Sequence, residues 1–208
     1  MKNTRRLAAI TAAALTVGTL GACSSDDHDD KQDTLDTTSA PTNATWSGYA
    51  GIQVPTSEEQ GPLNDDPVLH GYEHSPQGAV LAAMNTQAQM ALAGDDKYAD
   101  VSTYTLAPGK GRDQWVQGRT LATVDGEVDP EQAPTFQGFR VDNYSDESAV
   151  VVLATDYPES GLLAYPVQVN WINDDWRVVP APQEAGVTPA QIDSMDGFTE
   201  FSAGKEDE

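Results

Sequence analysis

The chain has 208 residues and a formal net charge of −22, because 33 acidic residues stand against 11 basic ones. A surface this acidic repels phosphate backbones and anionic lipid heads, which argues against nucleic acid and against direct docking on a lipid surface. The one cysteine, Cys23, excludes a disulfide within the chain. The length allows about one ordinary domain once the atypical ends are set aside.

The N-terminus has the two parts of a secretory signal. Residues Met1–Arg6 carry three positive charges, and Leu7–Leu20 is an uncharged, largely apolar run of 14 residues. Such a run is shorter than the roughly 20 residues that a membrane-spanning helix needs. We therefore predict that residues 1–22 are a cleaved signal peptide. Its removal leaves 8 basic against 33 acidic residues, a net charge near −25.

The end of this signal carries a lipid-attachment pattern. The four residues Leu20, Gly21, Ala22 and Cys23 resemble a bacterial lipobox. The resemblance implies that Leu20, Gly21 and Ala22 are recognised by the processing enzymes, and that Cys23 receives a diacylglycerol and becomes the mature N-terminus. An ordinary signal peptide with a chance cysteine is the alternative. Two acyl chains anchor a protein stably, so we expect a lipoprotein on the extracytoplasmic face of the cell membrane.

A polar tether is expected to follow the anchor. Residues 23–45 contain one large apolar side chain, Leu35, among many Asp, Ser and Thr residues. Such a segment cannot bury enough surface to offset the entropy lost on ordering, so we predict that it is disordered. A flexible coil of this length has an end-to-end distance of roughly 25 Å. The folded domain is then expected over residues 46–203, with a frayed tail at 204–208.

Three helices are expected in the first half of this domain. Ser75 and Pro76 form a typical helix start, and apolar residues continue at helical spacing to a stop at Gly94. The many alanines of this helix predict close packing against another element rather than a wide cofactor pocket. A second helix, capped by Asp95 or Asp96, is expected to carry the four apolar residues Tyr98, Val101, Tyr104 and Leu106. A third helix is expected over Gly111–Thr123.

The second half of the domain is predicted to be an antiparallel sheet. Four segments are rich in β-branched and aromatic residues, namely Phe136–Tyr144, Ala149–Tyr157, Leu162–Ile172 and Trp176–Val179. Residues Asn173–Asp175 predict a tight hairpin between the last two, and Pro166 predicts a sheet edge or a bulge. Ile192, Met195, Phe198 and Phe201 are expected to pack back on the body. The fold class is therefore α+β, with N-terminal helices packed on one face of a C-terminal antiparallel sheet.

Two motifs resemble catalytic or binding signatures but lack their context. Residues His70–His74 read HGYEH, the inverted zinc-protease pattern, yet that chemistry needs both histidines on one helix face and a third ligand. The glycine inside the motif and the proline that follows it predict a loop. Residues Gly109–Arg112 lack the spacing of a phosphate-binding loop and predict a turn, whose charge, together with Arg119, could contact an acidic partner. We expect no catalytic residue, no cofactor and no metal site.

Several short segments resemble one group of proteins. They are Gly71–Val80 with Ala82 and Ala83, Pro108–Asp113, Gly138–Val141 and Asp196–Phe198. They are similar to uncharacterised exported actinobacterial proteins encoded among conjugation or type IV secretion genes, over residues 46–201. The resemblance implies a cone-like α+β fold similar to nuclear transport factor 2-like domains. Many of those proteins are anchored by a transmembrane helix, whereas this chain has a lipobox.

Three functions follow from these observations. The first is a non-catalytic binding or assembly module with a protein partner, accessory to a secretion or conjugation apparatus. The second is binding of a small ligand in the mouth of the cone, lined by aromatic residues such as Tyr98, Trp115, Phe136 or Trp171, for which plain core packing is the alternative. The third is a cone-fold enzyme, which would need an Asp or Glu with a raised pKa facing a pocket. We predict that the protein is not an enzyme.

Overall fold

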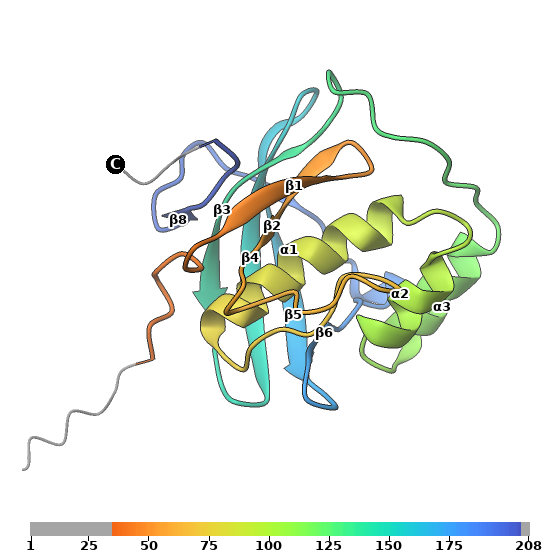
Figure 1. Cartoon of the computed structure of the whole chain (residues 1–208). Helices are drawn as coiled ribbons and strands as arrows, with labels where there is room; N and C mark the ends of the chain where they lie inside the picture. The colour runs from red at the N-terminus through yellow and green to blue at the C-terminus, as the bar shows by residue number, and fades with distance from the viewer. Residues whose placement is uncertain (1–34, 205–208) are drawn as a thin grey trace, which may run out of the picture. The chain divides into compact units, whose positions relative to one another are not determined.

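The computed structural model describes residues 35–204. The predicted signal peptide, the lipobox Leu20–Ala22, Cys23 and nearly all of the C-terminal tail therefore lie outside the described residues. The architecture is mixed, with three helices and a six-stranded antiparallel sheet in the order β6-β5-β4-β3-β8, and with β7 paired to β5 (Figure 1). This confirms the predicted combination of helices and an antiparallel sheet.

The sheet follows the predicted strands closely. Its strands are β3 (Thr135–Asp142), β4 (Ser148–Tyr157), β5 (Gly161–Trp171), β6 (Trp176–Val178), β7 (Ala190–Gln191) and β8 (Thr199–Glu200). The turn between β5 and β6 has positive φ at Asn173 (53°) and Asp174 (59°), as a tight hairpin turn requires. The predicted return of the C-terminus is also present, since Phe201 is buried and its ring centroid lies 4.9 Å from that of Trp46.

Pro166 lies where β5 has no outer neighbour. On that side β6 pairs with residues 169–171 and β7 with residues 163–164. The carbonyls of Leu162 and Gln168 accept hydrogen bonds from this outer side, and residues of one parity face one side of a strand. Pro166 therefore directs its carbonyl and its nitrogen to the open edge, where the missing N–H removes no hydrogen bond of the ladder. The predicted edge position is confirmed.

Helix α1 (Pro76–Leu92) crosses the sheet and begins at the predicted cap. The Ser75 hydroxyl accepts a hydrogen bond from the backbone N–H of Gly78 at 3.1 Å. A hairpin of β1 (Thr45–Tyr49) and β2 (Ile52–Thr56) lies along the helix (Figure 1). Because the sheet and this hairpin both contact α1, most of the helix is buried, including Asn85, whose amide donates to the Pro55 carbonyl at 2.9 Å.

The next two helices differ from the prediction at their ends. Helix α2 (Tyr98–Tyr104) has Lys97 as its N-cap and no side-chain cap. Asp95, an expected cap, instead accepts a hydrogen bond from the backbone N–H of Val124 at 3.2 Å. Helix α3 (Lys110–Arg119) starts inside the segment that was predicted to be a turn, and it ends before Thr123. Helix α3 begins at Lys110, directly after Gly109, so the turn predicted for residues 109–112 is wrong from Lys110 onward, and the helix expected from Gly111 begins one residue earlier.

Arg119 at the end of α3 has a structural role. Its side chain is buried, and one Nη donates to the Ala93 carbonyl at 2.6 Å while the other donates to the Ala122 carbonyl at 3.2 Å. It also lies 3.5 Å from the Asp95 carboxylate. The positive charge therefore sits against the C-terminal end of α1, where it is favourable. Arg119 is therefore buried and bonded within the domain, and it does not offer a surface contact for an acidic partner.

The ordered body begins before residue 46. Residues 35–45 were expected to belong to the linker, but Pro41 is buried and several backbone groups are bonded to the body. The Thr199 hydroxyl donates to the Thr38 carbonyl at 2.6 Å, and the Gln60 amide oxygen accepts from the Thr42 N–H at 2.8 Å. Polar side chains of distant segments thus satisfy the backbone of this stretch, which hydropathy does not reveal.

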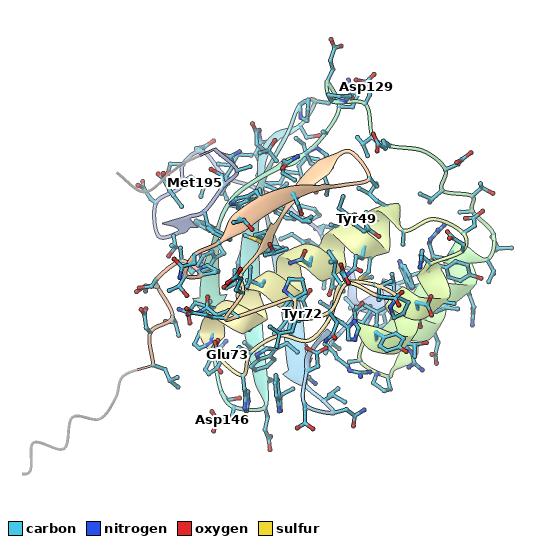
Figure 2. All side chains as sticks on the ribbon, viewed as in Figure 1. Tyr49, Tyr72, Glu73, Asp129, Asp146 and Met195 are labelled. Carbon is cyan, nitrogen blue, oxygen red and sulfur yellow. The ribbon has the colours of Figure 1, made fainter. Side chains whose placement is uncertain are left out.

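A buried carboxylate joins the loop before α1 to the hairpin between β5 and β6. The Asp175 side chain accepts hydrogen bonds from the backbone N–H groups of Gly71 at 2.9 Å and Tyr72 at 2.8 Å. Burial raises the pKa of Asp175, while these two N–H groups partly oppose the shift. Figure 2 labels Tyr72 and Glu73, two consecutive residues of this loop, and the Trp176 indole donates to the Glu73 carbonyl at 3.0 Å.

Candidate functional site

A cavity of about 300 Å³ lies between the C-terminal part of α1 and the sheet. Its floor consists of side chains that are buried in the domain, which are Ile52, Ala88, Phe136, Leu153 and Thr155. Leu92, Leu163 and Tyr165 add half-buried walls. The volume is at the lower end of the range for ligand pockets, which is about 300–1,000 Å³, so the cavity suits a small molecule or one short chain.

The small side chains of α1 leave this space open. Ala88 and Ala91 line the cavity one helical turn apart, opposite the aromatic and branched side chains of the sheet. The alanines were predicted to pack closely against another element and to leave no wide cofactor pocket. Ala79, Ala82, Ala83 and Ala88 are buried in the core, and the cavity beside Ala88 and Ala91 is small, about 300 Å³.

Four polar side chains line the cavity without an internal partner. Gln87, Thr155, Tyr157 and Tyr165 all contribute to its wall. Within residues 35–204 none of these side chains has a hydrogen-bond partner, and their polar atoms keep access to solvent. Burial raises the pKa of Tyr157, so its hydroxyl stays neutral and can donate at physiological pH. An amide and three hydroxyls are thus free to form hydrogen bonds with a bound molecule.

The cavity wall carries no charge. None of the residues around it is Asp, Glu, Lys, Arg or His, although charged residues make up 21% of the chain. An ion transferred into such an apolar space would lose its hydration without gaining a counter-charge, which is costly. The arrangement therefore favours an uncharged ligand, apolar over most of its surface, with a group that can form hydrogen bonds.

The cavity opens to solvent at one end of α1. Ala91, Tyr157 and Pro189 are exposed at this mouth. Val128 also reaches it from the loop between α3 and β3, and its backbone N–H donates to the Ala50 carbonyl at 2.9 Å. Figure 2 shows the next residue, Asp129, at the outer end of that loop. A ligand can therefore enter without unfolding of the core.

The structure does not assemble the predicted aromatic lining. Phe136 lies in the cavity floor, whereas Trp115 lines a neighbouring groove and Tyr98 lines a shallow pocket beside Arg119. Trp171 stacks on the His74 ring with centroids 4.0 Å apart. The four polar residues of the cavity wall were not predicted. No local pattern distinguishes them, because α1, β4 and β5 meet only in the folded domain.

The two histidines of the HGYEH segment are held apart in a loop, as predicted. The His74 Nε2–H donates to the Asp146 carbonyl at 2.6 Å, and His70 Nδ1 lies 2.7 Å from the Val68 carbonyl. Within residues 35–204 no group of three or more His, Cys, Asp or Glu side chains could hold a metal ion. In the same residues no helix is long and apolar enough to cross a membrane.

The comparisons with known proteins assign no activity. A family model described as a domain of unknown function, DUF8175, matches residues 10–200. No curated protein and no solved structure matches the chain. The matched range includes the cavity residues, from Ile52 to Pro189.

Proposed function

The chain belongs to the DUF8175 family, and from that premise we propose that it is a non-catalytic binding module whose cavity takes a small, uncharged and largely apolar molecule. One observation carries the proposal: Gln87, Thr155, Tyr157 and Tyr165 face an apolar cavity without a hydrogen-bond partner in residues 35–204. Specific ligand sites typically combine apolar walls with a few such polar groups. A protein partner, and a role beside a secretion apparatus, remain predictions from the sequence.

The cavity also supports a proposal about the fold family. A helix that crosses a curved antiparallel sheet and leaves a cavity at one end fits the cone-like arrangement of nuclear transport factor 2-like domains. We propose that arrangement for this domain. In such a cone, the sheet and the helix together enclose the ligand, and the loop before β3 forms part of the rim.

We further propose that Cys23 anchors the protein by acyl chains at the outer face of the cell membrane. Cys23→Ser should move the protein from the membrane fraction into the medium, because the acylated sulfur is lost. Ser24→Ala is the matched control and should leave the protein on the membrane. Fractionation, with mass spectrometry of the N-terminus, measures this. Membrane retention of Cys23→Ser, or a wild-type protein with an intact Met1, would contradict the anchor.

Ligand binding is tested by filling the cavity. Octan-1-ol serves as the probe, and the full-length chain carrying Cys23→Ser is the parent. We expect octan-1-ol to bind the parent, and Ala88→Leu to weaken binding about tenfold or more, a loss of about 1.4 kcal/mol. The added carbons occupy space that the probe needs. Isothermal titration calorimetry gives the affinities.

Ala99→Leu is the matched control for this experiment. It makes the same change on α2, at an exposed position away from the cavity, and should leave octan-1-ol binding unchanged. Thermal unfolding of both variants shows whether they fold. A parent that binds no octan-1-ol, or equal binding by folded Ala88→Leu and Ala99→Leu, would overturn the proposed function.

A further inference from the structure

A second hollow adjoins the cavity. It is a groove of about 710 Å³ between α3, the open edge of β5 and the segment of residues 178–187. Gln87 and Tyr165 line both the cavity and the groove. These two side chains are therefore a shared wall, and neither makes a hydrogen bond within residues 35–204. The two hollows therefore meet at these two side chains.

The groove differs from the cavity in its polar groups. It is lined by four glutamines, Gln87, Gln114, Gln168 and Gln183. The Gln114 Oε1 accepts a hydrogen bond from the Gln183 backbone N–H, and its Nε2 donates to the Glu184 carboxylate. The Gln183 side chain makes no hydrogen bond in the described part of the chain, and Gln168 uses only its Nε2, toward Asn170. The carbonyl of Pro166 also faces this open edge of β5. The groove thus offers both donors and acceptors.

No free charge lines the groove. None of its residues is Asp or Glu, and its one charged side chain, Arg119, is bonded to Ala93 and Ala122 and paired with Asp95. Neutral amides and a peptide carbonyl can donate hydrogen bonds to ester groups and exchange them with hydroxyl groups. The negative charge of the whole chain further disfavours an anion.

We infer that the ligand is a single-chain amphiphile with an uncharged, hydroxyl-bearing head. Its hydrocarbon chain occupies the apolar cavity, and its head lies in the groove among Gln168, Gln183 and the Pro166 carbonyl. Gln87 and Tyr165 contact the junction between chain and head. This inference rests on the proposed function, because the chain uses the same cavity, and it adds the head group and the groove that binds it.

The test compares three probes that share the same chain length. They are octan-1-ol, 1-octanoylglycerol and the octanoate ion, titrated into the full-length Cys23→Ser parent. We expect 1-octanoylglycerol to bind about tenfold more tightly than octan-1-ol, the gain that about 1.4 kcal/mol of head-group contacts would give. Octanoate should bind more weakly than either, since its charge has no partner.

Variants then separate the head from the chain. Gln168→Ala combined with Gln183→Ala should abolish the advantage of 1-octanoylglycerol and leave octan-1-ol binding unchanged. Both residues are exposed, so the fold should persist. Gln132→Ala, an exposed glutamine outside both hollows, is the matched control and should change neither affinity.

Each outcome decides one of the two proposals. Equal affinities for 1-octanoylglycerol and octan-1-ol, or an advantage that survives the double substitution, would overturn the amphiphile inference while the cavity still binds octan-1-ol. A parent protein that does not bind octan-1-ol would overturn the proposed function. An advantage that disappears in the double variant, with Ala88→Leu weakening both probes, would support both.

Discussion

Asp175→Ala should lower the free energy of unfolding by about 4 kcal/mol, because it leaves two backbone N–H groups without their charged acceptor. The carboxylate accepts from Gly71 and Tyr72 at 2.9 and 2.8 Å, and the Tyr72 side chain is buried. These bonds join the loop that leads into α1 to the hairpin between β5 and β6. Urea unfolding followed by tryptophan fluorescence measures the change, since Trp176 beside this carboxylate is fully buried.

A pair of asparagine substitutions provides the control for Asp175. Asp175→Asn keeps the size of the side chain but replaces one acceptor oxygen with an NH₂ group that faces a backbone N–H. It should cost about 2 kcal/mol or more. Asp174→Asn makes the same change at the exposed neighbour, where φ is 59° and asparagine is tolerated. If Asp175→Asn and Asp174→Asn had equal urea midpoints of unfolding, the buried carboxylate would contribute nothing to stability.

Gly111→Ala should destabilise the domain by about 3 kcal/mol through overpacking. A Cβ on Gly111 would lie 1.8 Å from the Pro180 carbonyl oxygen and 2.6 Å from its carbon. Both atoms belong to the backbone, so they cannot rotate away as a side chain can. Helix α3 or the segment of residues 178–187 must move instead. Because both segments line the groove, the same substitution should also weaken 1-octanoylglycerol binding.

Gly118→Ala on the same helix is the matched control. No atom lies within 4 Å of a Cβ built on Gly118, and the residue is exposed. Alanine is the better helix former, so this variant should gain about 0.5–1 kcal/mol. If the close approach at Gly111 decides the effect, chemical denaturation should show a lower free energy of unfolding for Gly111→Ala and a higher one for Gly118→Ala. A Gly111→Ala protein as stable as the parent would contradict the contact between α3 and Pro180.

Much of the fold could be predicted because its signals are local. Ser75 followed by Pro76 specifies the start of α1, and β-branched and aromatic runs specify β3 to β6. Asn173 and Asp174 tolerate the positive φ of the hairpin turn. Each of these features depends on residues within a few positions of one another. The ends of α2 and α3 were less predictable, since Asp95 bonds Val124 and Gly111 is placed by Pro180, both distant in sequence.

The sequence by itself determined the order of the three helices and of β3 to β6, and the antiparallel pairing of these strands, because side-chain periodicity and turn chemistry act over short stretches of chain. The β1–β2 hairpin and strands β7 and β8 were not predicted. Only the tertiary structure decided the cavity, which Ala88 and Ala91 of α1 line together with Leu153 and Tyr165 of β4 and β5. The tertiary structure also decided that residues 35–45 are bonded to the folded body and that the buried Asp175 carboxylate accepts a hydrogen bond from the Tyr72 N–H. A void or a long-range hydrogen bond is a property of two surfaces that meet, so neither can be read from one segment alone.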